Sequence, residues 1–277
     1  MTIDEIIEKA LAEDIGDGDQ TSLSTIPKEA KGKAQLLIKE DGILAGVKIA
    51  EKVFNKVDKN IVFNVLLKDG EKVKYGDIAF VVEGSSIFLL SAERLALNFM
   101  QRMSGIATAT GKIVEKLHGL KTKVIDTRKT TPNLRILEKE SVVIGGGENH
   151  RMGLYDMIMI KDNHVDYAGG ISKAIKSAKR YLIENKKDLK IEIEVRNFKE
   201  LNEVLEIGNI DRIMLDNFSV KDMKKAIQII NGKYETEASG GITIDTIREY
   251  AETGVDFISV GALTHQVKSL DMSLKAF

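Results

Sequence analysis

Two short stretches of the chain hold most of the residue types that could bind an anion. The first, residues 145–151, joins three glycines to His150 and Arg151, and the second begins ten residues later at Lys161 and ends at His164. Adjacent glycines suit neither helix nor strand, because each loses more chain entropy on folding than other residues do. A flexible loop would explain the glycines alone, but together with the cations they predict an anion site.

A third cationic motif lies upstream, where Arg128 and Lys129 follow a short apolar run that begins at Val124. In α/β proteins, ligands bind beyond the carboxyl ends of parallel strands. Arginine offers a planar fork to a carboxylate or phosphate, whereas lysine offers a compact charge. Because a buried cation without a partner is costly to desolvate, the cluster of cations predicts a ligand with several negative charges.

Apolar runs alternate with amphipathic helical stretches through the second half of the chain, a pattern typical of β/α units. The runs cover residues 124–125, 157–160, 191–195, 213–215, 236–238 and 257–260. The connecting helices include residues 171–182, 198–206 and 220–230. About six strands are visible where a complete barrel has about eight. We therefore expect an α/β fold with an open or reduced β/α barrel.

The first part of the chain is organised differently. Its expected elements are an acidic helix, two strands joined by a tight turn at Asp41 and Gly42, and a long helix, over residues 2–12, 33–39, 43–47 and 92–117. We predict an N-terminal α+β sandwich domain over residues 1–110 and the barrel domain over residues 111–277. The last residues of the chain are expected to pack back on the N-terminal domain.

The composition excludes several classes of protein. The 277 residues include no cysteine, which excludes a disulfide framework, a cysteine nucleophile and a thiolate zinc site. No apolar run approaches about eighteen residues and no signal peptide is visible, so we expect no membrane association and a cytoplasmic location. The formal net charge of −1 argues against a nucleic-acid partner.

Carboxylates and glycines follow the later strands. Glu194 lies within one apolar run and Asp216 follows the next. Carboxylates beside phosphates commonly hold Mg2+, but these two could equally face a developing positive charge or pair with a neighbouring cation. The turns after the last two strands contain Ser239, Gly240, Gly241 and Gly261. Such turns resemble the late-strand phosphate cradle of barrels, in which backbone N–H groups bind the phosphate.

Nine segments resemble, in order and spacing, the quinolinate phosphoribosyltransferases, also called nicotinate-nucleotide pyrophosphorylases (carboxylating). They are residues 13–19, 93–98, 101–108, 126–130, 145–151, 160–164, 215–217, 237–242 and 259–265. The resemblance covers nearly the whole chain and implies an enzyme of de novo NAD biosynthesis that uses Mg2+. Such an enzyme converts quinolinate and phosphoribosyl pyrophosphate to nicotinate mononucleotide, pyrophosphate and CO2.

The resemblance also implies a role for each matching residue. The two carboxylates of quinolinate are matched by Arg128, His150, Arg151 and Lys161. Three catalytic positions are matched by Lys129, at the junction of both substrates, and by Glu194 and Asp216, on the ribose and metal side. The phosphate cradle is matched by Ser239, Gly240, Gly241 and Gly261, with His265 beside it. The family implies a homodimer in which Arg94 enters the partner subunit's site.

Two positions depart from the family's pattern. Val143 stands where a basic residue is usual, which leaves one positive charge fewer near the phosphates, and Asn133 stands where glycine is common. Asparagine tolerates positive φ, so the second change is the lesser one. Among the remaining histidines, His164 either orients its loop or contacts a ligand, and His118 is expected at the surface.

Three alternative functions fit parts of the sequence. A paralogue associated with molybdenum transport shares the fold, but the complete motifs at residues 149–151 and 161–164 favour quinolinate. A barrel aldolase or isomerase of sugar phosphates would explain the glycines and Lys161, yet not the arginines. A non-catalytic barrel would bind quinolinate without turnover. The commoner phosphoribosyltransferase class is disfavoured, because its paired acidic residues before a Thr-Gly phosphate loop are absent.

Overall fold

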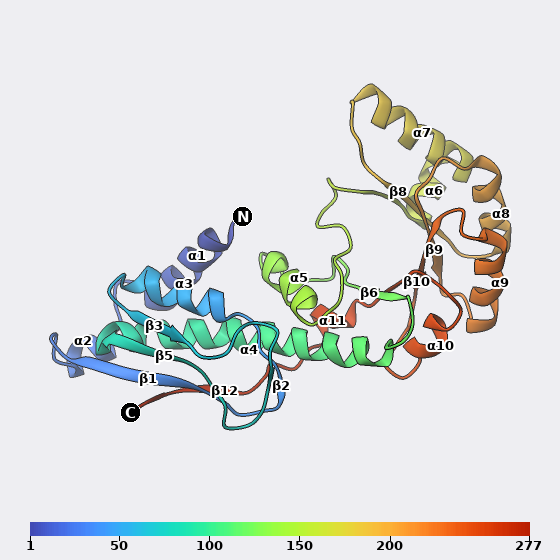
Figure 1. Cartoon of the computed structure of the whole chain (residues 1–277). Coiled ribbons are helices and arrows are strands. Elements are labelled where there is room, and N and C mark those ends of the chain that lie inside the picture. Colours follow the sequence, from blue (N-terminus) through green and yellow to red (C-terminus); the bar gives the residue numbers. More distant parts are fainter. The chain divides into compact units, whose positions relative to one another are not determined.

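The computed structural model describes all 277 residues, which form two compact units that are interleaved along the chain. Unit 1 comprises Met1–Gly111, Lys129–Gly146 and Ala262–Phe277, and unit 2 comprises Lys112–Arg128 and Gly147–Gly261. Each unit has a main sheet of its own (Figure 1). None of the helices combines the length and the apolar character needed to cross a membrane.

Unit 2 is an open β/α barrel, as the alternating pattern of the sequence predicts. Its six strands are β6 (Lys123–Ile125), β7 (Ile158–Ile160), β8 (Ile191–Val195), β9 (Arg212–Asp216), β10 (Glu235–Ser239) and β11 (Phe257–Ser259). All neighbours are parallel, in the order β6-β11-β10-β9-β8-β7, and the two end strands do not pair with each other. Each of the six predicted apolar runs is confirmed as one strand.

Helices follow the strands of unit 2 as crossovers. They are α6 (Asp162–Ala168), α7 (Ile171–Glu184), α8 (Phe198–Ile207), α9 (Val220–Ile230) and α10 (Ile247–Ala251). Two of them begin at side-chain caps: Asn197 Oδ1 accepts the N–H of Glu200 at 3.0 Å, and Ser219 Oγ accepts that of Asp222 at 3.1 Å. The three predicted crossover helices are therefore confirmed to within two residues at their ends.

Unit 1 is an α+β unit built on an antiparallel sheet in the order β12-β1-β5-β3. Its strands are β1 (Lys31–Ile38), β2 (Gly42–Ile43), β3 (Val62–Val65), β4 (Lys72–Val73), β5 (Ile78–Ser85) and β12 (Met272–Ala276). Its helices are α1 (Ile3–Ile15), α2 (Gln20–Thr25), α3 (Val47–Val57), α4 (Ser86–Lys116), α5 (Arg135–Ile144) and α11 (Ala262–His265). The last residues of α4 belong to unit 2.

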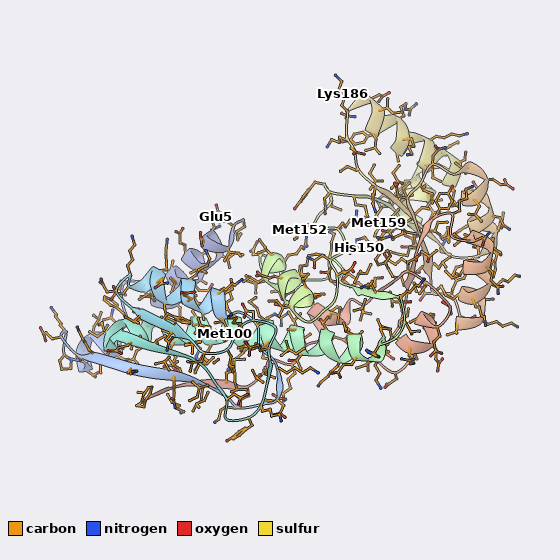
Figure 2. All side chains as sticks on the ribbon, viewed as in Figure 1. Glu5, Met100, His150, Met152, Met159 and Lys186 are labelled. Atoms are coloured by element: carbon orange, nitrogen blue, oxygen red, sulfur yellow. The ribbon has the colours of Figure 1, made fainter.

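The core of unit 1 combines aromatic rings with the buried face of α4. Phe54, Phe63 and Phe80 form a cluster whose ring centroids are 4.3 to 6.1 Å apart. Met100 of α4 is fully buried in the same core (Figure 2). At the other end of the chain, β12 pairs with β1 from Met272 to Ala276, so the last strand completes an edge of this sheet.

One predicted element of unit 1 is wrong. The sequence suggested a hairpin of residues 33–39 and 43–47, but β1 pairs with β5 and β12, and β2 pairs with β4. The chain enters α3 directly after Gly46, whose φ is +93°, and α3 buries Val47, Ala50 and Phe54. The apolar residues of this segment recur at the helical period, and packing on the core outweighs the turn signal at Asp41.

Candidate active site

The predicted site residues divide between the two units. Ten of the thirteen belong to unit 2: Arg128, His150, Arg151, Lys161, Glu194, Asp216, Ser239, Gly240, Gly241 and Gly261. Eight of them lie at or just beyond the carboxyl ends of the parallel strands, where α/β proteins bind ligands. His150 and Arg151 instead precede β7 and follow Glu148, which forms an isolated parallel bridge with Ile125 of β6. The remaining three, Arg94, Lys129 and His265, belong to unit 1 and are exposed.

Two arginines influence each other in the first part of the site. Arg128 follows β6, and Arg151 lies in the loop that precedes β7, where its Nη1 donates to the carbonyl of Met157 at 3.3 Å. Partial burial lowers the pKa of the Arg151 guanidinium, and the charge of Arg128 lowers it further. Like charges close together disfavour each other, so an anion bound between the two guanidinium groups would stabilise the pair.

A lysine and two carboxylates occupy the next strand ends. Lys161 Nζ lies 3.3 Å from Glu194 Oε2. Burial raises the pKa of Glu194, the Lys161 charge opposes this, and the charge of Asp216 adds to the rise. Glu194 and Asp216 come from the adjacent strands β8 and β9, so their charges act on the same space. Two carboxylates beside one cation are suited to a ligand that carries positive charge of its own.

The turn after β10 depends on glycine. Gly240 and Gly241 have φ values of +99° and +61°. A Cβ on Gly240 would lie only 2.2 Å from Oδ1 of Asn217, and the Asn217 N–H donates to the carbonyl of Ser239 at 2.9 Å. The ends of β9 and β10 are therefore in close contact, and their approach requires glycine at position 240.

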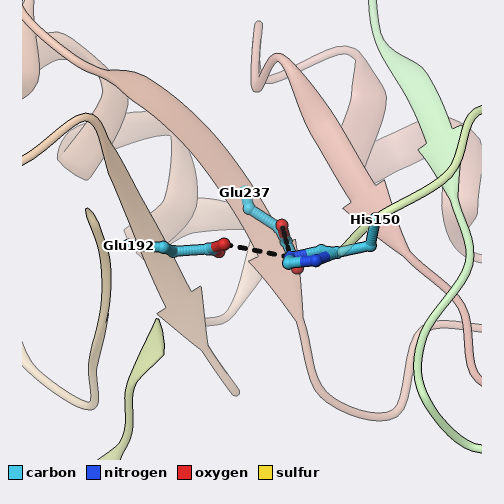
Figure 3. Close-up of side chains that lie close together, drawn as sticks. All are labelled: His150, Glu192 and Glu237. Carbon is cyan, nitrogen blue, oxygen red and sulfur yellow. Dashed lines mark ion pairs between the residues drawn. The ribbon is translucent and has the colours of Figure 1, made fainter. Parts of the chain in front are cut away.

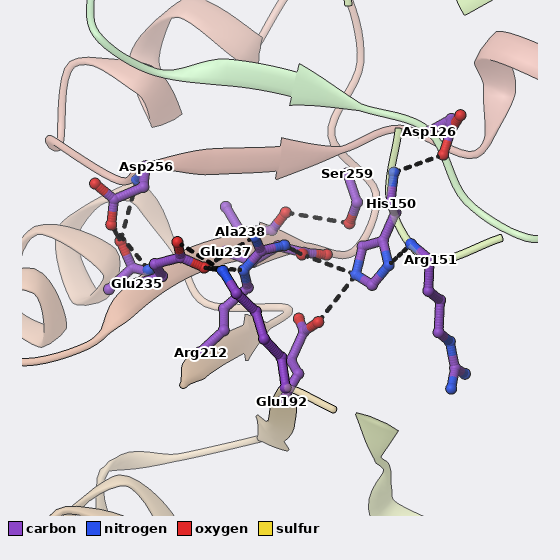
Figure 4. Close-up of polar contacts among 12 residues, drawn as sticks. Asp126, His150, Arg151, Glu192, Arg212, Glu235, Glu237, Ala238, Asp256 and Ser259 are labelled. Carbon is purple, nitrogen blue, oxygen red and sulfur yellow. Dashed lines mark hydrogen bonds and ion pairs between the residues drawn. The ribbon is translucent and has the colours of Figure 1, made fainter. Parts of the chain in front are cut away.

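A buried ionic cluster lies inside the parallel sheet. His150 Nε2 is 2.9 Å from Glu192 Oε2 and 3.2 Å from Glu237 Oε2, and all three residues are buried (Figure 3). Arg212 Nη1 lies 3.3 Å from the same Glu237 oxygen, and its Nη2 pairs with Glu235 at 3.0 Å (Figure 4). The sequence analysis assigned no role to Glu192, Arg212 or Glu237.

Hydrogen bonds satisfy only part of this cluster: Arg212 Nη1 donates to Glu237 Oε2 at 3.3 Å. Although Nε2 of His150 is close to both carboxylates, neither contact has hydrogen-bond geometry, and both oxygens of Glu192 lack a donor. Burial raises the pKa of Glu192, and the charge of Glu237 helps to bring it to about 7. Burial lowers the pKa of His150, but the two carboxylates outweigh this and raise it to about 9.

The positions of His150, Glu192 and Glu237 would also suit a metal ion, but two contacts argue against one. The backbone N–H of Arg151 donates to His150 Nδ1 at 2.6 Å, so in the neutral ring the lone pair is on Nδ1 and the proton is on Nε2, the atom that would face the metal. Metal-bound histidines instead donate from their other nitrogen. Arg212 also places a positive charge against Glu237. We therefore describe the group as an ionic cluster.

Both ring nitrogens of His150 thus face groups of the protein: Nδ1 the Arg151 N–H, and Nε2 the two carboxylates. The backbone N–H of His150 donates to Asp126 Oδ1 at 2.9 Å. The predicted contact of His150 with quinolinate stays a prediction. Glutamates within apolar strands, as in Ile191–Val195, are the sequence signal that could have revealed the cluster.

The structure also bears on three smaller sequence predictions, those for Asn133, His164 and His118. Asn133 adopts the positive φ that was expected of it, at +67°. His164 Nδ1 accepts the backbone N–H of Lys161 at 2.9 Å, which gives His164 a structural part in orienting the loop. Val143 lies on α5 and is 51% exposed, and His118 is exposed beyond the end of α4.

Comparisons with known proteins agree on one family. Residues 19–104 match the family model for the N-terminal domain of quinolinate phosphoribosyl transferase, and residues 106–275 match that for its C-terminal domain. The chain is 46% identical to quinolinate phosphoribosyltransferase [decarboxylating] 2, mitochondrial, of Nicotiana glauca, over 98% of this chain and 81% of that protein. It is 41% identical to the probable nicotinate-nucleotide pyrophosphorylase [carboxylating] of Bacillus subtilis, over 99% and 93%.

Solved structures give the same result. The chain superimposes on NadC from Streptococcus pyogenes with a TM-score of 0.94 at 41% identity, covering 99% of this chain and 95% of that one. It superimposes on the nicotinate-nucleotide pyrophosphorylase from Francisella tularensis with a TM-score of 0.92 at 42% identity, covering 99% and 96%.

Proposed function

The chain belongs to the quinolinate phosphoribosyltransferase family, and on this premise we propose which of its residues perform the family's reaction. It is a pentosyltransferase that transfers phosphoribosyl from phosphoribosyl pyrophosphate to quinolinate with decarboxylation. The products are nicotinate mononucleotide, pyrophosphate and CO2, which places the reaction in NAD biosynthesis.

One observation carries the assignment of the quinolinate site. Arg128 and Arg151 are close enough for the charge of one to lower the pKa of the other, and Lys161 lies at the next strand end of the same sheet. Quinolinate carries two adjacent ring carboxylates, and bidentate arginine contacts suit such groups. We assign the two arginines and Lys161 to these carboxylates, with His150 adjacent to Arg151 as in the family's pattern.

The ribose is assigned to the carboxylates of the site. Loss of pyrophosphate leaves positive charge on the ribose ring, and carboxylates held in advance stabilise such charge most effectively. Glu194 and Asp216 lie at the ends of adjacent strands, and the charge of Asp216 adds to the rise in the pKa of Glu194 that burial causes. The quinolinate nitrogen attacks the anomeric carbon and becomes a pyridinium. Its positive charge stabilises the electron pair left on the adjacent ring carbon as CO2 leaves, and that carbon then takes a proton from solvent. The protein therefore contributes positioning and charge, without a covalent nucleophile.

Three further groups complete the proposal. Ser239, Gly240, Gly241 and Gly261 would bind phosphate through backbone groups, with His265 beside them, and Lys129 would contact both substrates. The donor set at the strand ends fits Mg2+, since Glu194 and Asp216 offer the oxygen ligands that this ion prefers, directly or through phosphate and water. Bound there, Mg2+ would neutralise charge on the departing pyrophosphate.

The proposed assembly is a homodimer in which Arg94 of one subunit enters the site of its partner. Support comes from the family and from the position of Arg94 on the exposed side of α4. Arg94→Ala and Lys129→Ala should each retain only a small residual activity, and mixing the two proteins should restore activity, because one site of a mixed dimer is then intact. Demonstrated subunit exchange without any recovery would contradict the proposal.

A cytoplasmic location is also proposed, supported by the absence of cysteine.

The reaction is tested by supplying purified protein with quinolinate, phosphoribosyl pyrophosphate and Mg2+, and by measuring CO2 release and nicotinate mononucleotide. A parallel reaction replaces quinolinate with nicotinate, which lacks the second carboxylate. We expect turnover with quinolinate only, since nicotinate leaves part of the cation cluster without a partner. Equal turnover of both would contradict the assignment of the arginines. Repeating the assay with Val143→Arg tests whether the missing charge weakens binding of phosphoribosyl pyrophosphate.

A further inference from the structure

A buried ion pair joins two helices of unit 1. Glu138 lies on α5 and is 1% exposed, and Arg102 lies on α4. Arg102 Nε donates to Glu138 Oε1 at 2.8 Å, and its Nη2 lies 2.7 Å from the same oxygen. The sequence analysis gave neither residue a role, and neither belongs to the site proposed above.

The pair is connected to the segment that carries Lys129. Arg102 Nη2 donates to Thr131 Oγ1 at 3.0 Å and to the carbonyl of Thr264 at 2.8 Å. The second oxygen of Glu138 accepts the backbone N–H of Thr131 at 3.1 Å. Thr264, which is 1% exposed, donates from Oγ1 to the carbonyl of Lys129 at 2.8 Å.

These contacts converge on a stretch without regular secondary structure. Residues 127–131 belong to neither helix nor strand, so no hydrogen-bond ladder fixes their backbone. The network instead holds the carbonyl of Lys129 and the N–H of Thr131 from two sides. Arginine is well suited to this task because its planar fork makes several directed hydrogen bonds at once.

We propose that Arg102, Glu138 and Thr264 are positioning residues for Lys129. They fix the backbone on both sides of Thr130, so that the Lys129 side chain starts from one defined Cα position. The proposal rests on the function assigned above, because the role of Lys129 comes from it. Misplacing a catalytic group by about 1 Å can cost on the order of 100-fold in rate, so a network that fixes its backbone has a direct effect on turnover.

The sharpest test is a matched pair at one buried position. Thr264→Val removes the hydroxyl that binds the Lys129 carbonyl while keeping the shape, and Thr264→Ser keeps the hydroxyl. We expect Thr264→Val to lower kcat roughly 10-fold with little change in the KM for quinolinate. Thr264→Ser should stay within about twofold of the wild type. Arg102→Lys, which keeps the charge but loses the fork, should behave like Thr264→Val.

The same substitutions are then made in a Lys129→Ala background. If the network acts through Lys129, Thr264→Val should not slow the Lys129→Ala enzyme further, because effects that pass through one group are not additive. A loss of the same factor in both backgrounds would overturn the proposal, as would a Thr264→Val enzyme with wild-type kcat. A merely structural role would lower the unfolding midpoint without this dependence on Lys129.

Amide hydrogen exchange gives a readout that does not depend on turnover. The backbone N–H groups of residues 129–131 should exchange at least about tenfold faster in Thr264→Val and Arg102→Lys than in wild type, because hydrogen bonds that hold the segment are lost. Unchanged amide exchange in both variants would overturn the proposal, whichever substrate the enzyme uses. Faster exchange in a wild-type protein that fails to use quinolinate would instead point to an error in the assigned reaction.

Discussion

Glu138 in unit 1 and Glu192 in unit 2 are both buried, yet the first has a donor for each of its oxygens and the second has none. Glu138 lies on a helix beside an irregular segment, where the backbone N–H of Thr131 is available to it. Glu192 lies in the middle of a parallel sheet, and the neighbouring strands already use their backbone groups in the ladder. Only side chains are therefore available to donate hydrogen bonds to the Glu192 carboxylate.

The difference has a physical consequence for each group. Hydrogen bonds to a buried carboxylate keep it charged and fix the groups around it, which suits the Arg102 network for positioning. A buried carboxylate without donors tends to take up a proton instead, which agrees with the raised pKa of Glu192. The structure therefore predicts different responses of the two regions to substitution and to pH.

The largest loss of stability is expected when the buried ionic cluster of unit 2 loses the carboxylate of Glu237. Glu237→Ala leaves Arg212 and His150 without their shared partner. Removing one partner of a buried ionic group costs about 3–5 kcal/mol, and urea denaturation at pH 7 measures it. Glu235→Ala is the matched control, because Glu235 pairs with the same Arg212 but is 39% exposed. Its cost should stay near or below about 1 kcal/mol. Equal costs would contradict the comparison.

Much of unit 2 could be predicted because its information is local. The six strands follow from apolar runs, and the site residues follow from the polar residue types at their ends. The resemblance to a family then supplied roles for residues such as Lys161 and Asp216. Asn133 was also interpreted correctly, since its positive φ depends on its own backbone.

The features that were missed depend on contacts between distant residues. The chain shows a turn signal at Asp41, but β1 before it pairs with β5 and β12, and β2 after it pairs with β4. The partners of Arg102 come from three other segments, and the nearest is 29 residues away in sequence. No local pattern distinguishes Glu138 on α5 from an exposed helix residue, whereas Glu192 within an apolar strand gave a usable signal.

A pH series sharpens the comparison at His150. Its pKa rises from 6.5 to about 9 in the folded protein, so the stability that it contributes is fully present below pH 6.5 and is lost as the pH rises through 9. The Arg151 N–H that donates to Nδ1 opposes protonation of this nitrogen. We therefore expect the free energy of unfolding to fall by about 2 kcal/mol between pH 6.5 and 9.5, which is less than the full rise in pKa would give. Urea denaturation of wild type and of His150→Gln over this pH range measures the loss, and the free energy of unfolding of the variant should not show this fall with pH. Parallel profiles would show that the ring stays neutral.

The smallest effect is expected at Glu192, and the most direct comparison is the same substitution, Glu to Gln, made at one buried carboxylate in each unit. At pH 8 Glu192 is mostly charged, because its pKa is about 7, and it faces the charge of Glu237. Glu192→Gln removes this repulsion and provides an N–H2 group, so stability should be unchanged or rise by up to about 1 kcal/mol. Glu138→Gln should cost about 1.5–3 kcal/mol, because it weakens hydrogen bonds from a charged donor.

The sign of the Glu192 effect should follow the pH. A carboxyl group whose pKa is raised on folding contributes stability below its unfolded value of 4.5 and loses it as the pH rises through about 7. The advantage of Glu192→Gln over wild type should therefore grow between pH 5.5 and pH 8 in urea denaturation, whereas the cost of Glu138→Gln should not reverse over this range. A constant loss for Glu192→Gln at every pH would mean that Glu192 accepts hydrogen bonds as Glu138 does, and the two buried carboxylates would then be equivalent.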